Sequence, residues 1–170
     1  AMREALSQGR QAYVICPLVG LSRESRAERA EDGTLFSSLA QGSDISDPRA
    51  AEQEAARLQR EVFSGYHVGL LTGRMSAAEK QEVMDAFNEG SIDVLVATTV
   101  VEVGVDVPNA TMMLIEDAER FGLSQLHQLR GRVGRGEHPG TVFLVADPGK
   151  DDTETQARMD AFVSTTDGFE

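Results

Sequence analysis

The sequence predicts an α/β domain in which a parallel sheet is covered by helices on both faces. Short runs rich in Val, Ile and Leu alternate with segments of helical composition, which is the chain order of a parallel sheet. The runs are apolar at nearly every position, and such runs are typical of strands buried on both faces. A chain of 170 residues is large enough for one core and short for two, so we expect a single domain over residues 1–170.

Five runs are the predicted strands. They read AYVIC, HVGLL, IDVLVA, TMMLIE and TVFLVA, at residues 12–16, 67–71, 92–97, 111–116 and 141–146. Three segments between them are predicted helices, at residues 48–63, 76–88 and 124–130. Ser76 and Glu79 form a capping box at the start of the second helix, and Ser124 is the predicted N-cap of the third.

The net charge of -12 would ordinarily argue against a nucleic-acid partner, but the negative charge is unevenly placed. Residues 23–54 and 147–170 hold nine of the twelve excess negative charges, and we interpret both stretches as solvated surface. Residues 31–47, rich in Ser, Gly and Asp, are predicted to be a flexible insertion, and residues 148–170 an acidic tail. The rest of the chain is near charge balance and can present a basic face.

The sequence pattern argues against the membrane and secreted classes. No apolar run approaches the ~18 residues that span a bilayer, and no signal-peptide pattern is visible. The single Cys16 lies in an apolar run, which favours a cytoplasmic setting over a disulfide framework. His67 and His127 have no second ligand at metal-binding spacing, so no metal site is predicted. The start at Ala1 and the end at Glu170, without a helix-ending signal, indicate an excised fragment of a longer protein.

Glycines end the third predicted helix within QLRGRVGR, residues 128–135, where three arginines occur in six positions. Arginine keeps its charge at any working pH, and its planar fork holds two phosphate oxygens at once. Arg132 and Arg135 are therefore candidate arginine fingers for a transferred phosphoryl group. The competing interpretation is that these arginines, Arg130 above all, form surface ion pairs with nearby acids. The acids in question are Glu116, Asp117 and Glu119.

Polar residues follow the third predicted strand, at the end where parallel sheets bind ligands. Thr98 and Thr99 carry short hydroxyls suited to a phosphodiester backbone, and Gly104 lets a ligand approach the main chain closely. Asp106 can accept a hydrogen bond from a ribose hydroxyl or orient an arginine. Each of these residues, taken alone, is more often a turn or cap residue. Glu102 has no evident partner for proton transfer, and we assign it no role as a general base.

A phosphate cradle of the form G-x-x-x-x-G-K-[ST] does not occur in this sequence. The Gly-Lys pair at residues 149–150 is followed by Asp151 in the acidic stretch. The chain is therefore not expected to hold a nucleoside triphosphate by itself. Arginine fingers without a P-loop imply a partner that has one, either another domain or another chain.

Three segments of the chain resemble a known family in their sequences and in their order. LLTGRMSAAEKQEVMDAF, VLVATTVVEVGVDVP and GLSQLHQLRGRVGRG are similar to the second RecA-like lobe of superfamily 2 helicases, over most of residues 10–147. Within that superfamily they resemble the RecG branch, bacterial ATP-dependent DNA helicases that remodel stalled forks and Holliday junctions. FGLSQLHQLRGRVGRG also resembles the transcription-repair coupling translocase, which is one alternative. A non-catalytic module that binds nucleic acid or protein is another.

On the nucleotide side, the resemblance implies a RecA-like parallel sheet and roles for individual residues. Arg132 and Arg135 would reach across an interlobe cleft toward ATP phosphates, and Gln128 would couple the nucleotide state to DNA. Gly104 and Asp106 would face the nucleotide. ATP with Mg would be bound mainly by the N-terminal RecA-like lobe of the same polypeptide, so the fragment alone is expected to be inactive.

On the nucleic-acid side, the resemblance implies that Thr98 contacts the DNA backbone and that Gly73 and Arg74 border the nucleic-acid track. Thr72 stands where the family usually has His, a departure that bears on any contact specific to an imidazole. The partner would be branched or forked DNA, and the protein would be a monomer at the nucleoid in a bacterial cytoplasm, away from membranes. The terminal TTDGFE resembles the approach to a helical hairpin that couples ATP turnover to translocation in this family.

Overall fold

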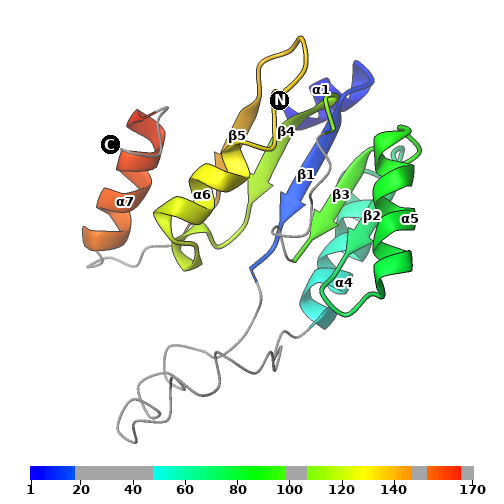
Figure 1. Ribbon diagram of the computed structural model, residues 1–170, viewed down its shortest axis with the longest axis horizontal. Coiled ribbons are helices and arrows are strands. Elements are labelled where there is room, and N and C mark those ends of the chain that lie inside the picture. Colours follow the sequence, from blue (N-terminus) through cyan, green and yellow to red (C-terminus); the bar gives the residue numbers. More distant parts are fainter. Residues whose placement is uncertain (18–47, 99–106, 147–152, 166–170) are drawn as a thin grey trace, which may run out of the picture.

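The computed structural model describes residues 1–17, 48–98, 107–146 and 153–165. Its centre is a sheet of five parallel strands in the order β2-β3-β1-β4-β5 (Figure 1). The strands are β1 Gln11–Ile15, β2 Val68–Leu71, β3 Val94–Ala97, β4 Ala110–Ile115 and β5 Thr141–Leu144. Each overlaps its predicted run, with the ends shifted by at most two residues. The α/β prediction is confirmed.

Helices cover both faces of the sheet, and the sheet separates the core into two clusters. The helical elements are α1 Met2–Ser7, α4 Pro48–Arg57, the π-helical turn η1 Leu58–Val62, α5 Ala77–Asn88, the 3-10 turn η2 Ala118–Arg120, α6 Leu123–Arg130 and α7 Thr153–Ser164. Helices α5, α6 and α7 contribute buried residues to one cluster, whereas α1 and η1 contribute to the other. Strands β1, β3 and β4 are buried on both faces, which explains why their runs are apolar at consecutive positions, whereas the edge strand β5 exposes alternate residues.

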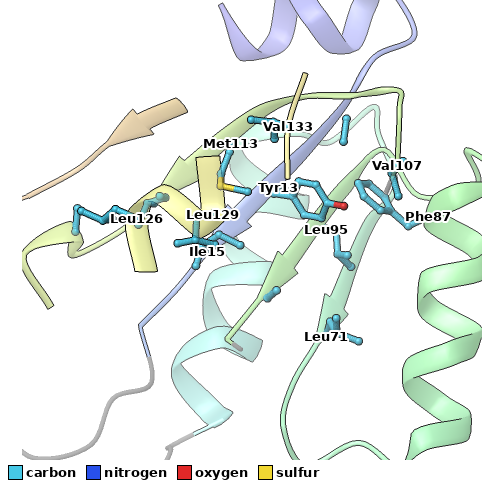
Figure 2. Packing of buried hydrophobic residues seen from close by; sticks show 14 of the residues in the cluster. Tyr13, Ile15, Leu71, Phe87, Leu95, Val107, Met113, Leu126, Leu129 and Val133 are labelled. Atoms are coloured by element: carbon cyan, nitrogen blue, oxygen red, sulfur yellow. The ribbon is translucent and has the colours of Figure 1, made fainter. Parts of the chain in front are cut away.

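Strand β1 shows how one run serves both clusters. Tyr13 and Ile15 point into the cluster beneath α5 and α6, whereas Ala12 and Val14 point into the cluster beneath α1 and η1. Figure 2 shows Tyr13 and Ile15 among Phe87, Leu126 and other members of the first cluster. The Tyr13 and Phe87 rings meet edge to face with centroids 5.0 Å apart. Strand β1 therefore joins the two layers at the middle of the sheet.

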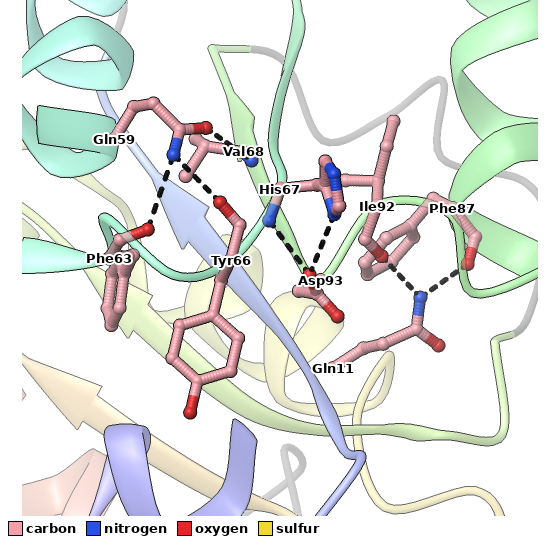
Figure 3. Close-up of polar contacts among 9 residues, drawn as sticks. All are labelled: Gln11, Gln59, Phe63, Tyr66, His67, Val68, Phe87, Ile92 and Asp93. Carbon is pink, nitrogen blue, oxygen red and sulfur yellow. Dashed lines mark hydrogen bonds and ion pairs between the residues drawn. The ribbon is translucent and has the colours of Figure 1, made fainter. Parts of the chain in front are cut away.

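Two amides tie loops to the sheet at the start of the strands (Figure 3). The Gln59 amide nitrogen donates to the carbonyls of Tyr66, at 2.7 Å, and of Phe63, at 3.3 Å, and its oxygen accepts from the Val68 N–H at 3.0 Å. The Gln11 amide nitrogen donates to the Ile92 carbonyl at 2.7 Å. These amides help to satisfy backbone polar groups at the start of the strands, and the Phe63 carbonyl also accepts from the Tyr66 N–H at 2.9 Å.

The helix predictions are confirmed in part. The capping box of α5 is present, since the Glu79 N–H donates to Ser76 Oγ at 3.2 Å and the Ser76 N–H donates to Glu79 Oε2 at 2.7 Å. Ser124 as the N-cap of α6 is wrong. The N-cap is Gly122, whose N–H donates to the side-chain oxygen of Gln125 at 2.9 Å, so Gln125 satisfies the N-cap amide while no hydroxyl caps the first-turn N–H groups.

The first predicted helix is interrupted and the acidic C-terminal stretch contains a helix. Helix α4 ends at Arg57, and the wider turn η1 follows, which buries both Leu58 and Phe63. Helix α7 lies in the stretch interpreted as solvated tail, next to α6 (Figure 1). It buries Met159 and Phe162. The predicted insertion at residues 31–47 lies outside the described residues. Within the described ranges, no helix has the length and apolar character needed to cross a membrane.

Candidate functional site

The carboxyl ends of the strands form one edge of the sheet, and three polar residues lie side by side along it. Ladder hydrogen bonds continue past the strands, from the Thr98 N–H to a β2 carbonyl at 3.1 Å, from the Cys16 N–H to a β3 carbonyl at 2.9 Å and from the Glu116 N–H to a β1 carbonyl at 2.9 Å. Parallel pairing therefore aligns the residues that follow each strand. This edge is where open α/β sheets bind ligands.

A tight turn after β2 adds Gly73 and Arg74 to this edge. The Thr72 N–H donates to Met75 Sδ at 3.4 Å, and the Met75 N–H donates to the Thr72 carbonyl at 3.3 Å. Thr72 is buried in this turn, whereas Arg74 is exposed. Since β2 pairs with β3, the turn lies next to Thr98, whose side chain is itself buried. The structure thus places Thr98, Gly73 and Arg74 at the same end of neighbouring strands.

The loop that carries Arg132 and Arg135 lies at the opposite edge of the sheet. The Gly134 N–H donates to the carbonyl of Ala110, the first residue of β4, at 3.2 Å. Gly134 has a φ of 71°, and a Cβ there would lie 2.2 Å from the Gly140 nitrogen, so only glycine fits this contact. Figure 1 shows this loop, between α6 and β5, at the end of the sheet away from the arrowheads. The two arginines are therefore held apart from Thr98 by the length of the strands.

Helix α6 presents the remaining motif residues. Gln128 is exposed on the helix, and the Arg132 N–H donates to the Leu129 carbonyl at 2.9 Å, so Arg132 continues directly from the last turn. Arg135 is exposed, and its Nε donates to the Gly131 carbonyl at 2.5 Å. The Arg135 side chain therefore folds back over the end of α6, where helix carbonyls lack partners. An anion offering a stronger acceptor could displace this contact.

The expected ion pair of Arg130 with Glu116, Asp117 or Glu119 is wrong. The Arg130 guanidinium donates instead to backbone carbonyls at the end of α7, those of Phe162, at 3.1 Å, and Thr165. Asp117 faces Arg120 at 3.8 Å, with both side chains substantially exposed. The carbonyls prevail because the end of α7 carries unpaired acceptors beside α6, and an arginine satisfies two of them at once.

Four side chains from three distant segments form a polar cluster at the carboxyl edge. The Cys16 thiol donates to Glu116 Oε2 at 3.4 Å, and the Glu116 and Glu54 carboxyls lie close enough to shift each other's pKa. The Arg57 guanidinium binds both oxygens of Glu54, with Nε to Oε2 at 2.9 Å. Sequence reasoning noted no such cluster, and the spacing of these residues offers no signal beyond the local Glu54–Arg57 pair.

Protonation in the cluster follows from burial and charge. Burial raises the pKa of Glu116, and the nearby Glu54 raises it further. The Arg57 hydrogen bonds lower the pKa of Glu54. Burial and the Glu116 carboxyl raise the pKa of the Cys16 thiol, so this thiol is not a reactive thiolate. Of the two carboxyls, Glu116 therefore binds a proton more readily, and Glu54 is the one that favours ionisation, against Arg57.

The donor set suits phosphate better than metal. Across residues 1–17, 48–98, 107–146 and 153–165, no three His, Cys, Asp or Glu side chains are grouped to hold a metal ion. The guanidinium groups of Arg132 and Arg135 can neutralise negative charge on a phosphate, but the sequence has no phosphate cradle. Other predicted site residues lie outside the described residues, namely Thr99, Glu102, Gly104 and Asp106.

Comparison with known proteins identifies relatives over nearly the whole chain. Residues 26–137 match the model of the helicase conserved C-terminal domain. The ATP-dependent DNA helicase RecG of Staphylococcus epidermidis is 48% identical over 172 residues, which span 99% of this chain and 21% of that protein. RecG of Bacillus subtilis is 45% identical over 170 residues, again 99% of this chain and 21% of the relative. A solved structure of RecG bound to a three-way DNA junction matches with a TM-score of 0.71 at 40% identity, covering 99% of this chain and 18% of that one.

Proposed function

The chain belongs to the helicase conserved C-terminal domain family, and on that premise we propose that it is the second motor lobe of an ATP-dependent DNA helicase of the RecG type. The chain spans about a fifth of the length of the curated relatives that it matches. The observation that carries the proposal is the glycine-anchored loop that presents Arg132 and Arg135, in a chain without a phosphate cradle. Such a lobe completes a nucleotide site whose other half is elsewhere.

On the nucleotide side, we assign Arg132 and Arg135 to the γ-phosphate of ATP. Closure of two RecA-like lobes would bring both guanidinium groups to the phosphate, and hydrolysis would release them. Arg135 would exchange the neutral Gly131 carbonyl for a charged oxygen, which is the stronger acceptor. We assign Gln128, which is exposed on α6, to coupling the nucleotide state to DNA.

Nucleotide and magnesium are assigned mainly to the N-terminal RecA-like lobe of the same polypeptide. Gly104 and Asp106 remain proposed contacts to the nucleotide from this chain. When bound, magnesium would neutralise phosphate charge during transfer. The guanidinium groups described above would add positive charge from the opposite side of the cleft.

On the nucleic-acid side, we assign the carboxyl edge of the sheet to DNA. Arg74 offers an exposed guanidinium, and Gly73 leaves the backbone of the turn open to a phosphate. Thr98 and Thr99 complete this proposed contact. Since the two proposed sites lie at opposite ends of the strands, the sheet and α6 form the rigid connection between them. Each cycle of closure would then move this edge along one strand of branched or forked DNA.

The proposal extends to the setting of the protein. The relatives reported above are bacterial proteins named as DNA helicases. We therefore propose a monomeric motor that works on the nucleoid in a bacterial cytoplasm. Gel filtration of the full-length protein, with and without a forked duplex, tests whether it is a monomer.

One experiment tests the half-site directly. ATP hydrolysis is measured with and without a model fork, for this chain alone and after addition of a separately expressed lobe that bears a P-loop. We expect no turnover by the chain alone and DNA-stimulated turnover on mixing, because each lobe holds half of the site. The same mixture with Arg132→Ala should stay silent. Hydrolysis by the chain alone would contradict the proposal.

Two assays of the full-length protein separate the alternatives, ATP hydrolysis by an Arg132 variant and unwinding of a branched duplex. A non-catalytic binding module would leave turnover unchanged when Arg132 is replaced in the full-length protein. A transcription-repair coupling translocase would hydrolyse ATP on DNA but would not unwind a branched duplex, whereas a RecG-type helicase would unwind it.

A further inference from the structure

The loop after α6 lies against a second segment of the chain through two glycines. The Gly134 N–H donates to the Ala110 carbonyl at 3.2 Å. Two residues further along, a Cβ on Gly136 would lie 2.7 Å from the Pro108 carbonyl oxygen and 3.3 Å from the Pro108 Cβ. The backbone at Gly136 reaches Pro108 so closely because glycine has no side chain. Arg135 therefore lies between two contacts with the same short segment, the one that leads into β4.

That segment is a tight turn, residues 107–110, with its own support. The Ala110 N–H donates to the Val107 carbonyl at 3.0 Å. Val107 is buried in the same core cluster as Val133, the residue before the first of the two glycines (Figure 2). The turn and the loop therefore start from fixed points in one core, and the glycine contacts lie beyond those points.

Asn109 joins the turn to the start of the sheet. Its Nδ2 donates to the Gly9 carbonyl at 2.8 Å and to Gln11 Oε1 at 3.1 Å, and its carbonyl accepts from the Gln11 N–H at 3.0 Å. Gln11 is buried, and its own amide nitrogen donates to the Ile92 carbonyl at 2.7 Å (Figure 3). The turn is thus fixed to the amino edge of the sheet.

The same turn continues directly from the other proposed nucleotide contacts of this chain. Asp106 is the residue before Val107 in the sequence, and Gly104 is two positions earlier. The contact between Pro108 and Gly136 therefore connects two segments that are far apart in the sequence and are both assigned to the nucleotide.

We propose that Gly136 is a positioning residue for Arg135, acting through its close backbone contact with Pro108. The inference rests on the proposed function of Arg135. Gly136 touches neither nucleotide nor DNA in this scheme, and it lets the loop lie at the distance from the turn that places the adjacent guanidinium. The φ of Gly136 is not positive, so the requirement for glycine here is steric alone.

A Cβ at residue 136 would push the loop away from the turn. Arg135 is the adjacent residue and would move with the loop, whereas Arg132 lies on the other side of Gly134, next to the end of α6. The displacement therefore falls mainly on Arg135. A displacement of about 1 Å at a catalytic group is enough to slow a reaction severely.

The test uses the full-length protein, with kcat and KM for ATP measured at saturating forked DNA. Gly136→Ala adds only the Cβ, and we expect kcat to fall about tenfold with KM changed by less than about twofold, because a finger acts on the transition state. Gly122→Ala is the matched control, since it lies at the other end of α6 and its Cβ would have no neighbour closer than 3.7 Å. Its kcat should not change.

A double-mutant cycle with Arg135→Ala separates positioning from a general structural role. If Gly136 acts through Arg135, Gly136→Ala should change the residual kcat of Arg135→Ala by less than about twofold, because the group that it displaces is gone. A structural role would slow both backgrounds by the same factor. Thermal unfolding of each variant sets the assay temperature well below its melting temperature, so that only folded protein is compared.

The outcomes distinguish this inference from the proposed function. If Gly136→Ala keeps kcat within about twofold of the unmodified protein while Arg135→Ala has lost turnover, positioning is overturned and the finger role stands. An equal loss in both backgrounds, or a loss that Gly122→Ala shares, overturns positioning too. Near-normal turnover by Arg135→Ala overturns both ideas.

If Gly136→Ala does not fold, Asn109→Asp decides. This change keeps the size of the side chain but sets a carboxylate against two acceptors, the Gly9 carbonyl and Gln11 Oε1, so the turn is displaced from the sheet. We expect a loss of kcat of about tenfold in this variant as well. Unchanged kcat would overturn positioning.

Discussion

Arg135 Nε donates to the carbonyl of Gly131 at 2.5 Å, so the proposed finger is folded back over the helix that precedes it. The acceptor is neutral and the side chain is exposed, which means that the contact is readily exchanged. If Arg135 acts on ATP as proposed, a phosphate oxygen would compete with the Gly131 carbonyl for its guanidinium.

Arg135→Ala in the full-length protein is expected to reduce DNA-stimulated ATP hydrolysis by about a thousandfold or more, the usual contribution of an arginine finger. Arg135→Lys should recover little, because an ammonium cannot offer two parallel donors. Steady-state hydrolysis with a forked duplex gives the rates, and thermal unfolding should show no loss of stability for this exposed residue. Near-normal turnover in Arg135→Ala would rule out the finger role.

Gly134→Ala is expected to destabilise the chain by roughly 2–4 kcal/mol, since it combines a positive φ with a steric collision. The added Cβ would lie 2.2 Å from the Gly140 nitrogen at a φ of 71°. Gly90→Ala is the matched control, because Gly90 has a φ of 83° and open space around it. It should lose only about 1 kcal/mol from the backbone conformation alone.

Urea unfolding of the 170-residue chain measures both glycine variants. Gly65→Ala adds a third point, because Gly65 has neither a positive φ nor a neighbour within 4 Å, and its stability should be unchanged or slightly higher. Equal losses at residues 134 and 90 would show that the contact with Gly140 is not tight.

Glu116→Gln is expected to raise the stability of the folded chain at neutral pH. Burial raises the pKa of Glu116 above its usual value of 4.5, and Glu54 raises it further. The folded state therefore binds this proton more tightly than the unfolded state. The stability from this group is present below the unfolded pKa and is lost as pH rises through the folded pKa. Glutamine cannot ionise, so the variant should lose less stability over that range.

Glu54 has the opposite effect on the pH dependence of stability, because its hydrogen bonds from Arg57 lower its pKa. Its contribution is present above the unfolded pKa and is lost as pH falls through the folded pKa. Urea unfolding at a series of pH values tests both signs, with Glu61→Gln as an exposed control. If stability varies with pH in Glu116→Gln as it does in the unmodified chain, then the pKa of Glu116 is not raised in the folded state.

Gln59→Ala is expected to destabilise the chain by about 2–3 kcal/mol, because three backbone groups lose their amide partner near the start of β2. Gln53→Ala is the control, since Gln53 is exposed on α4. Hydrogen exchange should show faster exchange at the Val68 N–H in the Gln59 variant alone. Unchanged protection there would mean that strand β2 does not depend on this amide.

Local sequence determined the elements of this fold. Five apolar runs became the five strands, and Ser76 with Glu79 started α5 as a capping box, because each signal lies within a few neighbouring residues. The order of three motifs also identified the family, and it is the family that gives Arg132 and Arg135 their proposed role. Local signals were weaker at α6, whose N-cap is Gly122 and not the predicted Ser124.

Only the tertiary structure decided which of these residues meet. Cys16 and Glu116 are 100 positions apart, and Arg130 and Thr165 are 35 apart, so no local pattern encodes either contact. The structure also placed the Arg132–Arg135 loop at the opposite end of the strands from Thr98, because α6 runs back along the sheet before β5 begins. Which acid holds a proton, and which carbonyls an arginine binds, depends on burial and proximity that exist only once the chain has folded.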